Sequence, residues 1–188
     1  MIIQHLKPDS TKIIFWAKGS SQELFIYPPT ADFQKRDFLF RISLATVEAE
    51  SSVFTPFPGV QRTLMLLKGE HTLMHKGYHT KRLSPFEQDT FEGDWETSSL
   101  GKATNFNLMC RSGASGIMKY LKGSQGEKTT LKIKSDLELI YLYAGKASYQ
   151  GKSMESGDCL VIEKEKTSLI LECEEACDFV QVSVALKP

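Results

Sequence analysis

Net charge, long hydrophobic runs and a recognisable leader are all missing from this chain of 188 residues. Its 23 basic and 23 acidic side chains cancel, which argues against a nucleic-acid-binding or membrane-surface protein, because both usually carry a basic footprint. The start, "MIIQHLKPDSTKIIFW", lacks the basic region, the apolar core and the cleavage site that a signal peptide requires. No apolar stretch approaches the roughly 20 residues that span a bilayer. We therefore expect a cytoplasmic protein with no nucleic-acid or membrane partner.

Cysteine is scarce, and its four copies are unevenly placed. Cys110, Cys159, Cys173 and Cys177 fit reduced, buried thiols of a cytoplasmic protein. Cys173 and Cys177 have the spacing of half a metal site, but no second Cys or His pair lies nearby in the sequence. A structural role is the favoured interpretation.

Motifs for catalysis are also absent. The sequence shows no nucleophile motif, no evident pair of catalytic carboxylates and no glycine loop of the kind that cradles phosphate. The segment "KGSQGEK" (122–128) contains glycine but is typical of a hairpin turn. These absences favour binding over catalysis.

Alternating strand patterns dominate what is present. "RDFLFRISLATV" places Phe38, Phe40, Ile42 and Leu44 on one face and Arg41 on the other. Further short apolar runs, among them "LELIYLY", "TSLILEC" and "DFVQVSVAL", are separated by glycine and polar turns. No helical period extends beyond about ten residues. The pattern predicts an all-β sandwich or barrel.

An internal repeat relates residues 64–100 to residues 139–171. Each segment runs from an apolar strand to a glycine (Gly69, Gly145), through a short strand to Lys76–Gly77 or Gln150–Gly151, and on to a second strand pair. The stretch "RSGASG" (111–116) is the expected seam between the halves. Because repeats of this kind are structural units, the sequence predicts two related β-barrels packed into one compact body.

The repeat pattern resembles the cupin jelly roll, and the N-terminal half resembles the HutD/Ves family. The resemblance rests on "FWAKGSSQEL" (15–24), "FLFRISLATV" (38–47), "FTPFPGVQRTLMLLKG" (54–69), "FEGD" (91–94) and "NFNLM" (105–109), which occur in that family's order and spacing. Two positions depart from the family pattern: "KGSSQE" replaces a run of glycines, and Asn105 stands where aspartate is usual.

The resemblance implies a bicupin fold and a bacterial cytoplasmic protein that is associated with histidine utilisation. It also implies a regulatory role and a ligand similar to formylglutamate. From this resemblance we expect an N-terminal cupin barrel over residues 1–110 and a C-terminal cupin barrel over residues 111–188. The N-terminal strand is able to cross over and complete the C-terminal barrel. A homodimer is one open possibility for its assembly.

Three of the four histidines, His71, His75 and His79, are spaced four apart in "GEHTLMHKGYHTKRL" (69–83). Residues four apart on a strand are separated by about 13 Å, too far for two nitrogens to bind one zinc ion. If Lys76–Gly77 is a two-residue hairpin turn, His75 and His79 fall on opposite faces. The sequence therefore predicts no metal site and no cofactor, and surface or hairpin-tip positions for these histidines.

The polar faces of two strands are the candidate binding site. If Arg41 and Asn107 point into the barrel, guanidinium and amide groups meet there, which suits recognition of a carboxylate. Solvent-facing strands show the same alternation, so that interpretation stays open. Trp16 either caps such a pocket or anchors the N-terminal strand. The predicted ligand-binding residues are Glu23, Arg41, Ser43, Arg62, Asn105, Asn107 and Met109.

The function that we predict is therefore non-catalytic binding of a small carboxylate metabolite, with a regulatory role in amino-acid or histidine utilisation. The alternative is a cupin-type enzyme, an isomerase, lyase or oxygenase, that acts on a small polar metabolite through Glu23 or an interior histidine.

Overall fold

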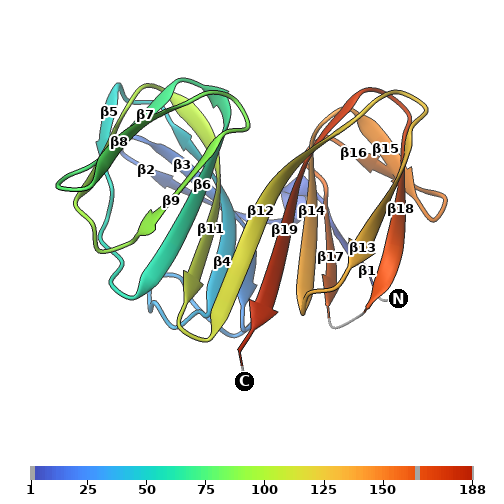
Figure 1. Cartoon of the computed structure of the whole chain (residues 1–188), viewed down its shortest axis with the longest axis horizontal. Helices are drawn as coiled ribbons and strands as arrows, with labels where there is room; N and C mark the ends of the chain where they lie inside the picture. The colour runs from blue at the N-terminus through green and yellow to red at the C-terminus, as the bar shows by residue number, and fades with distance from the viewer. Residues whose placement is uncertain (1–2, 164–165, 188) are drawn as a thin grey trace. The chain divides into compact units, whose positions relative to one another are not determined.

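The computed structural model describes residues 3–163 and 166–187, and it confirms the all-β prediction (Figure 1). Within these ranges the helical structure is one 3-10 turn, η1 (Pro8–Ser10), and no α-helix is present. No helix of the described residues is long and apolar enough to cross a membrane. The chain divides into two compact units, residues 12–114 and residues 1–11 with 115–188.

The first unit, residues 12–114, contains ten strands in two hydrogen-bonded sheets. The larger sheet has the order β2-β3-β4-β11-β6-β9 and the smaller one β5-β10-β7-β8. The strands are β2 (Lys12–Trp16), β3 (Gly19–Tyr27), β4 (Phe40–Val47), β5 (Ser51–Val53), β6 (Val60–Gly69), β7 (His71–His75), β8 (His79–Leu83), β9 (Gln88–Glu92), β10 (Thr97–Leu100) and β11 (Ala103–Arg111).

The second unit combines the N-terminal strand with the C-terminal part of the chain. Its sheets have the orders β1-β17-β14-β19-β12 and β13-β18-β15-β16. The strands are β1 (Ile3–Leu6), β12 (Ala114–Gly123), β13 (Lys128–Ile133), β14 (Leu137–Ala144), β15 (Lys146–Tyr149), β16 (Lys152–Glu155), β17 (Cys159–Glu163), β18 (Thr167–Cys173) and β19 (Cys177–Leu186).

Apolar side chains hold the two sheets of each unit together. In the first unit Leu64 and Leu66 of β6 pack with Leu73 of β7 and Leu83 of β8. In the second unit Leu131, Leu169 and Leu171 of the smaller sheet pack against Ile140 and Leu160 of the larger one. Such packing follows from period-two alternation, which buries one face of each strand. Each unit is thus a pair of facing sheets rather than a closed barrel.

The internal repeat appears as a match of strand order. The run β4-β11-β6-β9 in the first unit corresponds to β12-β19-β14-β17 in the second, and β5-β10-β7-β8 corresponds to β13-β18-β15-β16. Gly69 and Gly145 occupy the same place in the two units, with φ of 93° and 95°. A Cβ at Gly69 would lie 2.1 Å from the Lys102 carbonyl oxygen, and one at Gly145 would lie 2.2 Å from that of Ala176. Only glycine fits this close approach.

The β7–β8 hairpin differs from the sequence-based expectation by one residue. Gln150–Gly151 is a two-residue turn that pairs Tyr149 with Lys152, but the β7–β8 loop spans residues 76–78 and pairs His75 with His79. Because a shift of one residue exchanges the faces of a strand, the predicted separation of these histidines is wrong. Their ring centroids are 4.6 Å apart.

The predicted surface positions of the histidines are also wrong for two of the three. His71 and His75 have exposed fractions of 0% and 3%. They share the buried face of β7 with Leu73, whereas His79 is exposed on β8. The apolar neighbours of β7 explain this burial.

Hydrogen bonds to Asp158 hold the N-terminal segment in the second unit. The exposed fraction of Asp158 is 1%. β1 pairs with β17, and Asp158 accepts hydrogen bonds from His5 Nε2 (2.9 Å), Lys7 Nζ (2.7 Å) and the Glu155 amide (2.9 Å). Burial alone would raise the pKa of Asp158, but the bonds from Glu155, Lys7 and His5 outweigh it and hold the pKa below its ordinary value.

We expect Asp158→Asn to lower the free energy of unfolding at pH 7 by about 2 kcal/mol, because charge-assisted hydrogen bonds to a buried carboxylate are lost. The stabilisation from Asp158 is present above the unfolded pKa near 3.9 and is lost as pH falls through the lower folded pKa. Urea unfolding from pH 7 to pH 3 should therefore show a difference between wild type and variant that shrinks at acid pH. An equal difference at all pH values would contradict this.

Candidate functional site

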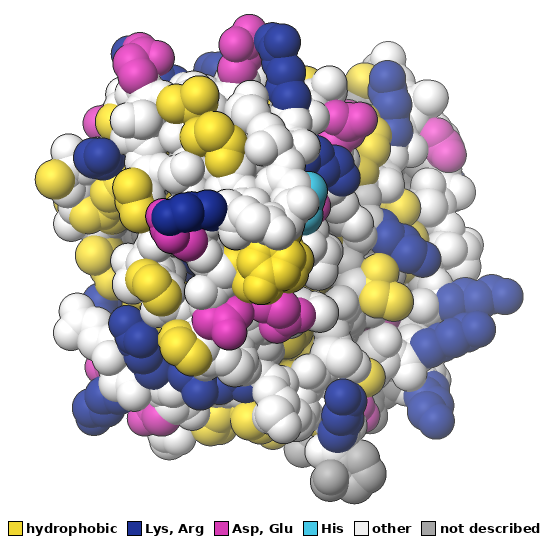
Figure 2. Space-filling view, turned by 60° about the vertical axis from the view of Figure 1, so that its left-hand side comes forward, with side chains coloured by type: hydrophobic (Ala, Val, Ile, Leu, Met, Phe, Trp, Pro, Cys, Tyr) yellow, Lys and Arg dark blue, Asp and Glu magenta, His cyan; other side chains and the backbone are white. Residues whose placement is uncertain are grey.

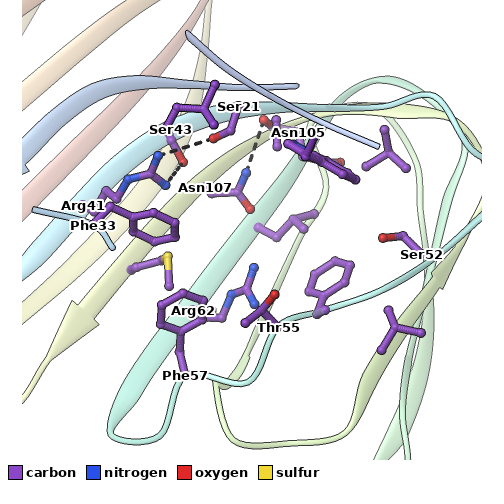
Figure 3. A pocket seen from close by; sticks show the side chains of 18 residues that line it. Ser21, Phe33, Arg41, Ser43, Ser52, Thr55, Phe57, Arg62, Asn105 and Asn107 are labelled. Atoms are coloured by element: carbon purple, nitrogen blue, oxygen red, sulfur yellow. Dashed lines mark hydrogen bonds between the residues drawn. The ribbon is translucent and has the colours of Figure 1, made fainter. Parts of the chain in front are cut away.

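A cavity of about 290 Å³ lies in the first unit. Its walls come from the larger sheet, from β5 and from the loop that precedes β6. Figure 3 shows the labelled polar side chains of Arg41, Ser43, Asn105, Asn107 and Arg62 around this one space. Pockets of a few hundred cubic ångströms are typical of small-molecule sites.

Strand alternation places the polar groups in the cavity. On β4, Phe40 and Ile42 are fully buried on the far face, while Arg41 and Ser43 line the cavity. β4 pairs with β11 so that Ser43 lies opposite Asn107. Neighbouring strands in register present the same face at paired positions. The two strands therefore form one polar wall.

Six of the seven predicted site residues line the cavity: Arg41, Ser43, Arg62, Asn105, Asn107 and Met109. Glu23, the seventh, is not among the lining residues; it lies opposite Ser43 on the neighbouring strand β3, and its carboxylate contacts Arg41. The prediction that these residues bind a ligand stays a prediction. The structure brings them together as a group.

Arg41 is already engaged by the protein. Its Nε donates to Glu23 Oε2 at 2.7 Å, and its terminal nitrogens donate to Ser43 Oγ at 2.9 Å and Ser21 Oγ at 3.4 Å. Its guanidinium carbon lies 4.0 Å from the ring centroid of Phe33. Burial lowers the pKa of Arg41, and the bond to Glu23 opposes that effect. Arg41 thus acts first as a fixed part of the wall.

Arg62 differs from Arg41 because no carboxylate of the described residues pairs with it. Its guanidinium carbon lies 4.8 Å from the Phe54 ring centroid and 5.3 Å from that of Phe91. Burial, together with the nearby charge of Arg41, lowers the pKa of Arg62 to about 10. The group remains a cation at neutral pH and has donors to offer a bound anion.

His71, on β7 of the smaller sheet, fixes the orientation of Asn105. Its Nδ1 lies 2.8 Å from Asn105 Oδ1, and since an amide oxygen can only accept, the imidazole donates. The Asn105 amide nitrogen is then the donor left for the cavity. Burial lowers the pKa of His71, which keeps the ring neutral at pH 7.

Sequence reasoning missed the apolar part of the cavity. Phe33, Phe54 and Phe57 line it from loops, and Trp16 lines it from β2. Trp16, for which the sequence left a cap and a strand anchor open, is thus one of the lining residues. The segment "FTPFPG" (54–59) was the available signal, because two phenylalanines in a Pro/Gly-rich loop need an apolar surface to cover.

The surface charge of the protein matches its neutral composition. Figure 2 shows basic and acidic side chains interspersed with hydrophobic ones on the face in view. The positive groups that line the cavity are Arg41 and Arg62. This pattern suits a small anion better than a polyanion.

Comparison with protein families gives one match that spans most of the chain. Residues 10–180 match the model of the family described as HutD. The structure is similar to a conserved protein of unknown function from Pseudomonas aeruginosa PAO1, with a TM-score of 0.83 and 22% identity over 98% of this chain and 100% of that one.

Two further solved structures have the same fold. HutD from Pseudomonas fluorescens SBW25, from a formate condition, has a TM-score of 0.78 and 20% identity, with full coverage of both chains. The pirin YhhW of Escherichia coli, in complex with nickel(II), has a TM-score of 0.75 and 13% identity, also with full coverage of both. These likenesses make the fold cupin-like.

The cavity does not fit the metal centre that cupin enzymes carry. Its lining contains two arginines and no histidine, cysteine or carboxylate, whereas a divalent metal needs such ligands. The donor set instead fits a carboxylate or another small anion.

We expect Glu23→Gln to lower the free energy of unfolding by about 2–3 kcal/mol, because it leaves the Arg41 cation buried without its counter-charge. Glu50→Gln is the matched control: the Lys102–Glu50 pair, 3.1 Å apart and exposed on both sides, should contribute less than about 1 kcal/mol. Denaturant unfolding of both variants measures the difference. Equal losses would mean that Glu23 does not stabilise Arg41.

Proposed function

Since the chain belongs to the HutD family, we propose that the cavity of its first unit binds a small carboxylate-bearing metabolite of the formylglutamate type. The observation that carries this proposal is the Arg62 guanidinium, which lies in the cavity with no carboxylate of the described residues to pair with it. A cation held in a partly apolar site is costly without a partner. A bound carboxylate supplies that partner.

The neighbours of Arg62 support a ligand with both charged and amide groups. Asn105 and Asn107 lie on β11, which pairs with the Arg62 strand β6, and the Asn105 amide is oriented by His71. Amide side chains donate to carboxylates and to carbonyl oxygens alike. Phe54 and Phe57 cover the apolar part of such a molecule. Arg62 is the principal anchor, and Arg41 has donors left after binding Glu23 and the two serines.

The finer fold that we propose is a bicupin, with one jelly-roll barrel in each unit. It is supported by the shared strand order of the two units and by the cupin-like neighbours. β1, which pairs with β17, is the crossover strand of the C-terminal barrel in this scheme.

The biological role that we propose is regulatory rather than catalytic and serves amino-acid, in particular histidine, utilisation. The name of the family supports the pathway. Binding and release of a pathway intermediate would let the protein set its free concentration in the cytoplasm. This role needs a ligand in the cavity and no chemistry on it.

We expect small carboxylates such as N-formylglutamate to raise the melting temperature of the protein, by mass action. The neutral diamide of N-formylglutamate, in which both carboxylates are replaced by amides, should raise the melting temperature less, because Arg62 binds a carboxylate more strongly. Arg62→Met should weaken binding by about 10–100-fold, the worth of a hydrogen bond to a charged group. Calorimetric titration gives the dissociation constants.

Arg82→Met is the matched control, since Arg82 is exposed and lies outside the cavity. It should bind as the wild type does. Two results would overturn the proposal: no carboxylate stabilises the wild type, or Arg62→Met responds as strongly as Arg82→Met. Arg62→Met removes an unpaired cation, so the ligand-free protein should keep its stability to within about 1 kcal/mol.

The regulatory role makes a separate prediction for cells grown on histidine. Cells with a chromosomal Arg62→Met allele should show the same change in the concentration of the bound intermediate as cells from which the gene is deleted. Cells with the Arg82→Met allele should match the wild type. Mass spectrometry of the pathway intermediates measures this. A binding-deficient protein that fully complements the deletion would contradict the role but not the binding site.

A further inference from the structure

A second cluster of polar side chains lies on the β7–β8 hairpin, outside the cavity. His75 ends β7, His79 begins β8 and Asp89 lies on β9. Asp89 Oδ2 is 3.2 Å from His75 Nε2 and 2.9 Å from His79 Nε2. The three ligand atoms all lie within 4.8 Å of one another. Two imidazoles and a carboxylate thus converge on one point.

The hydrogen bonds of His75 determine which of its nitrogens carries the proton. The Thr97 hydroxyl donates to the Trp95 carbonyl oxygen, so its oxygen accepts from His75 Nδ1 at 2.9 Å. With Nδ1 protonated, Nε2 of the neutral ring has a lone pair directed at the Asp89 carboxylate. Either a proton on Nε2 or a metal ion can bridge the 3.2 Å between this nitrogen and Asp89 Oδ2.

We propose that His75, His79 and Asp89 bind one divalent transition-metal ion of the class that includes Zn²⁺ and Ni²⁺. Imidazole nitrogen and carboxylate oxygen suit this class of ion. Bonds of about 2.1 Å at tetrahedral angles place ligand atoms about 3.4 Å apart, close to the two nitrogen–oxygen distances in the cluster. The site needs only small side-chain movements to form.

Neighbouring groups hold the ligand side chains of the cluster by hydrogen bonds. Thr97 holds the His75 ring through Nδ1, and the Thr90 amide donates to Asp89 Oδ1, which leaves Oδ2 for the ion. Metal-bound histidines usually donate their other ring nitrogen in this manner. The nearby Lys76 is paired with Glu96 at 2.8 Å, and Lys81 Nζ donates to the Gln88 carbonyl.

His75, His79 and Tyr78 line a surface depression beside the cluster. Three protein ligands leave room for water or a small exogenous ligand. The Phe91 ring, 4.4 Å from that of His75, separates the cluster from Arg62 of the cavity. The metal site and the carboxylate site are therefore distinct, and either can fail without the other.

The experiment is a calorimetric titration of tag-free, full-length protein with ZnCl₂ and NiCl₂. We expect one equivalent of metal per chain and at least a tenfold loss of affinity in His79→Ala. The His79 side chain is 39% exposed, so its removal should leave the fold intact, which circular dichroism checks. His5→Gln is the matched control, because His5 lies in the second unit, and it should bind metal as the wild type does.

A rescue variant separates ligation from hydrogen bonding. His79→Cys supplies a thiolate, which binds Zn²⁺ but replaces the imidazole hydrogen bond to Asp89 poorly, and it should recover Zn²⁺ affinity relative to His79→Ala. No Zn²⁺ or Ni²⁺ binding by the wild type, or equal affinity in wild type and His79→Ala, would overturn the site. The same holds if His79→Cys binds Zn²⁺ no better than His79→Ala.

Trp95 offers an optical readout, since its ring lies edge-on to His75 at 5.6 Å and His79 at 6.0 Å. In a Trp16→Phe background Trp95 is the one remaining tryptophan. Ni²⁺ should quench its fluorescence, and excess Zn²⁺, which does not quench, should restore it. Quenching that persists in Trp16→Phe with His79→Ala would place the ion elsewhere.

Discussion

The two-residue period of β4 and β11 is the constraint on which the first unit depends. One face of each strand carries the buried apolar side chains of Phe40, Ile42, Phe106 and Leu108, and the other carries the polar wall of the cavity. Changes to the side chains of one face must leave those of the other face in place, because alternate side chains of a strand point to the same side of the sheet. The buried apolar face and the polar lining of the cavity are therefore encoded in the same two segments of chain.

This constraint also explains which parts of the site could be predicted from the sequence. Alternation in "FLFRISLATV" and "NFNLM" grouped Arg41, Ser43, Asn105 and Asn107 correctly, because parity along a strand is a local property. The engagement of Arg41 by Glu23 depends on the pairing of β3 with β4, including the register shift between Glu23 and Phe25. The loop aromatics depend on tertiary packing. Neither the contact between Glu23 and Arg41 nor the packing of the loop aromatics can be deduced from a single segment of the sequence.

The hairpin histidines show the limit of such reasoning. The repeat suggested that Lys76–Gly77 should behave as Gln150–Gly151 does, yet one extra loop residue changed the register. Loop length is weakly specified by sequence, whereas its effect on side-chain direction is complete. A well-founded strand assignment therefore led to the wrong side of the sheet. The buried face of β7 was the better guide, because His71, Leu73 and His75 share it.

The two units have also diverged in what their sheets enclose. In the second unit the space between the sheets is filled by an apolar cluster that includes Tyr149, Met154 and Phe179, whereas in the first it holds the polar cavity. The three-residue loop at 76–78 adds a further asymmetry, since its counterpart has two residues. Deleting a single codon there would turn His79 away from His75, and the same one-residue shift would move Leu83 of β8 off the buried face. The length of this loop therefore sets both the histidine pair and the packing of β8 against the core of the unit.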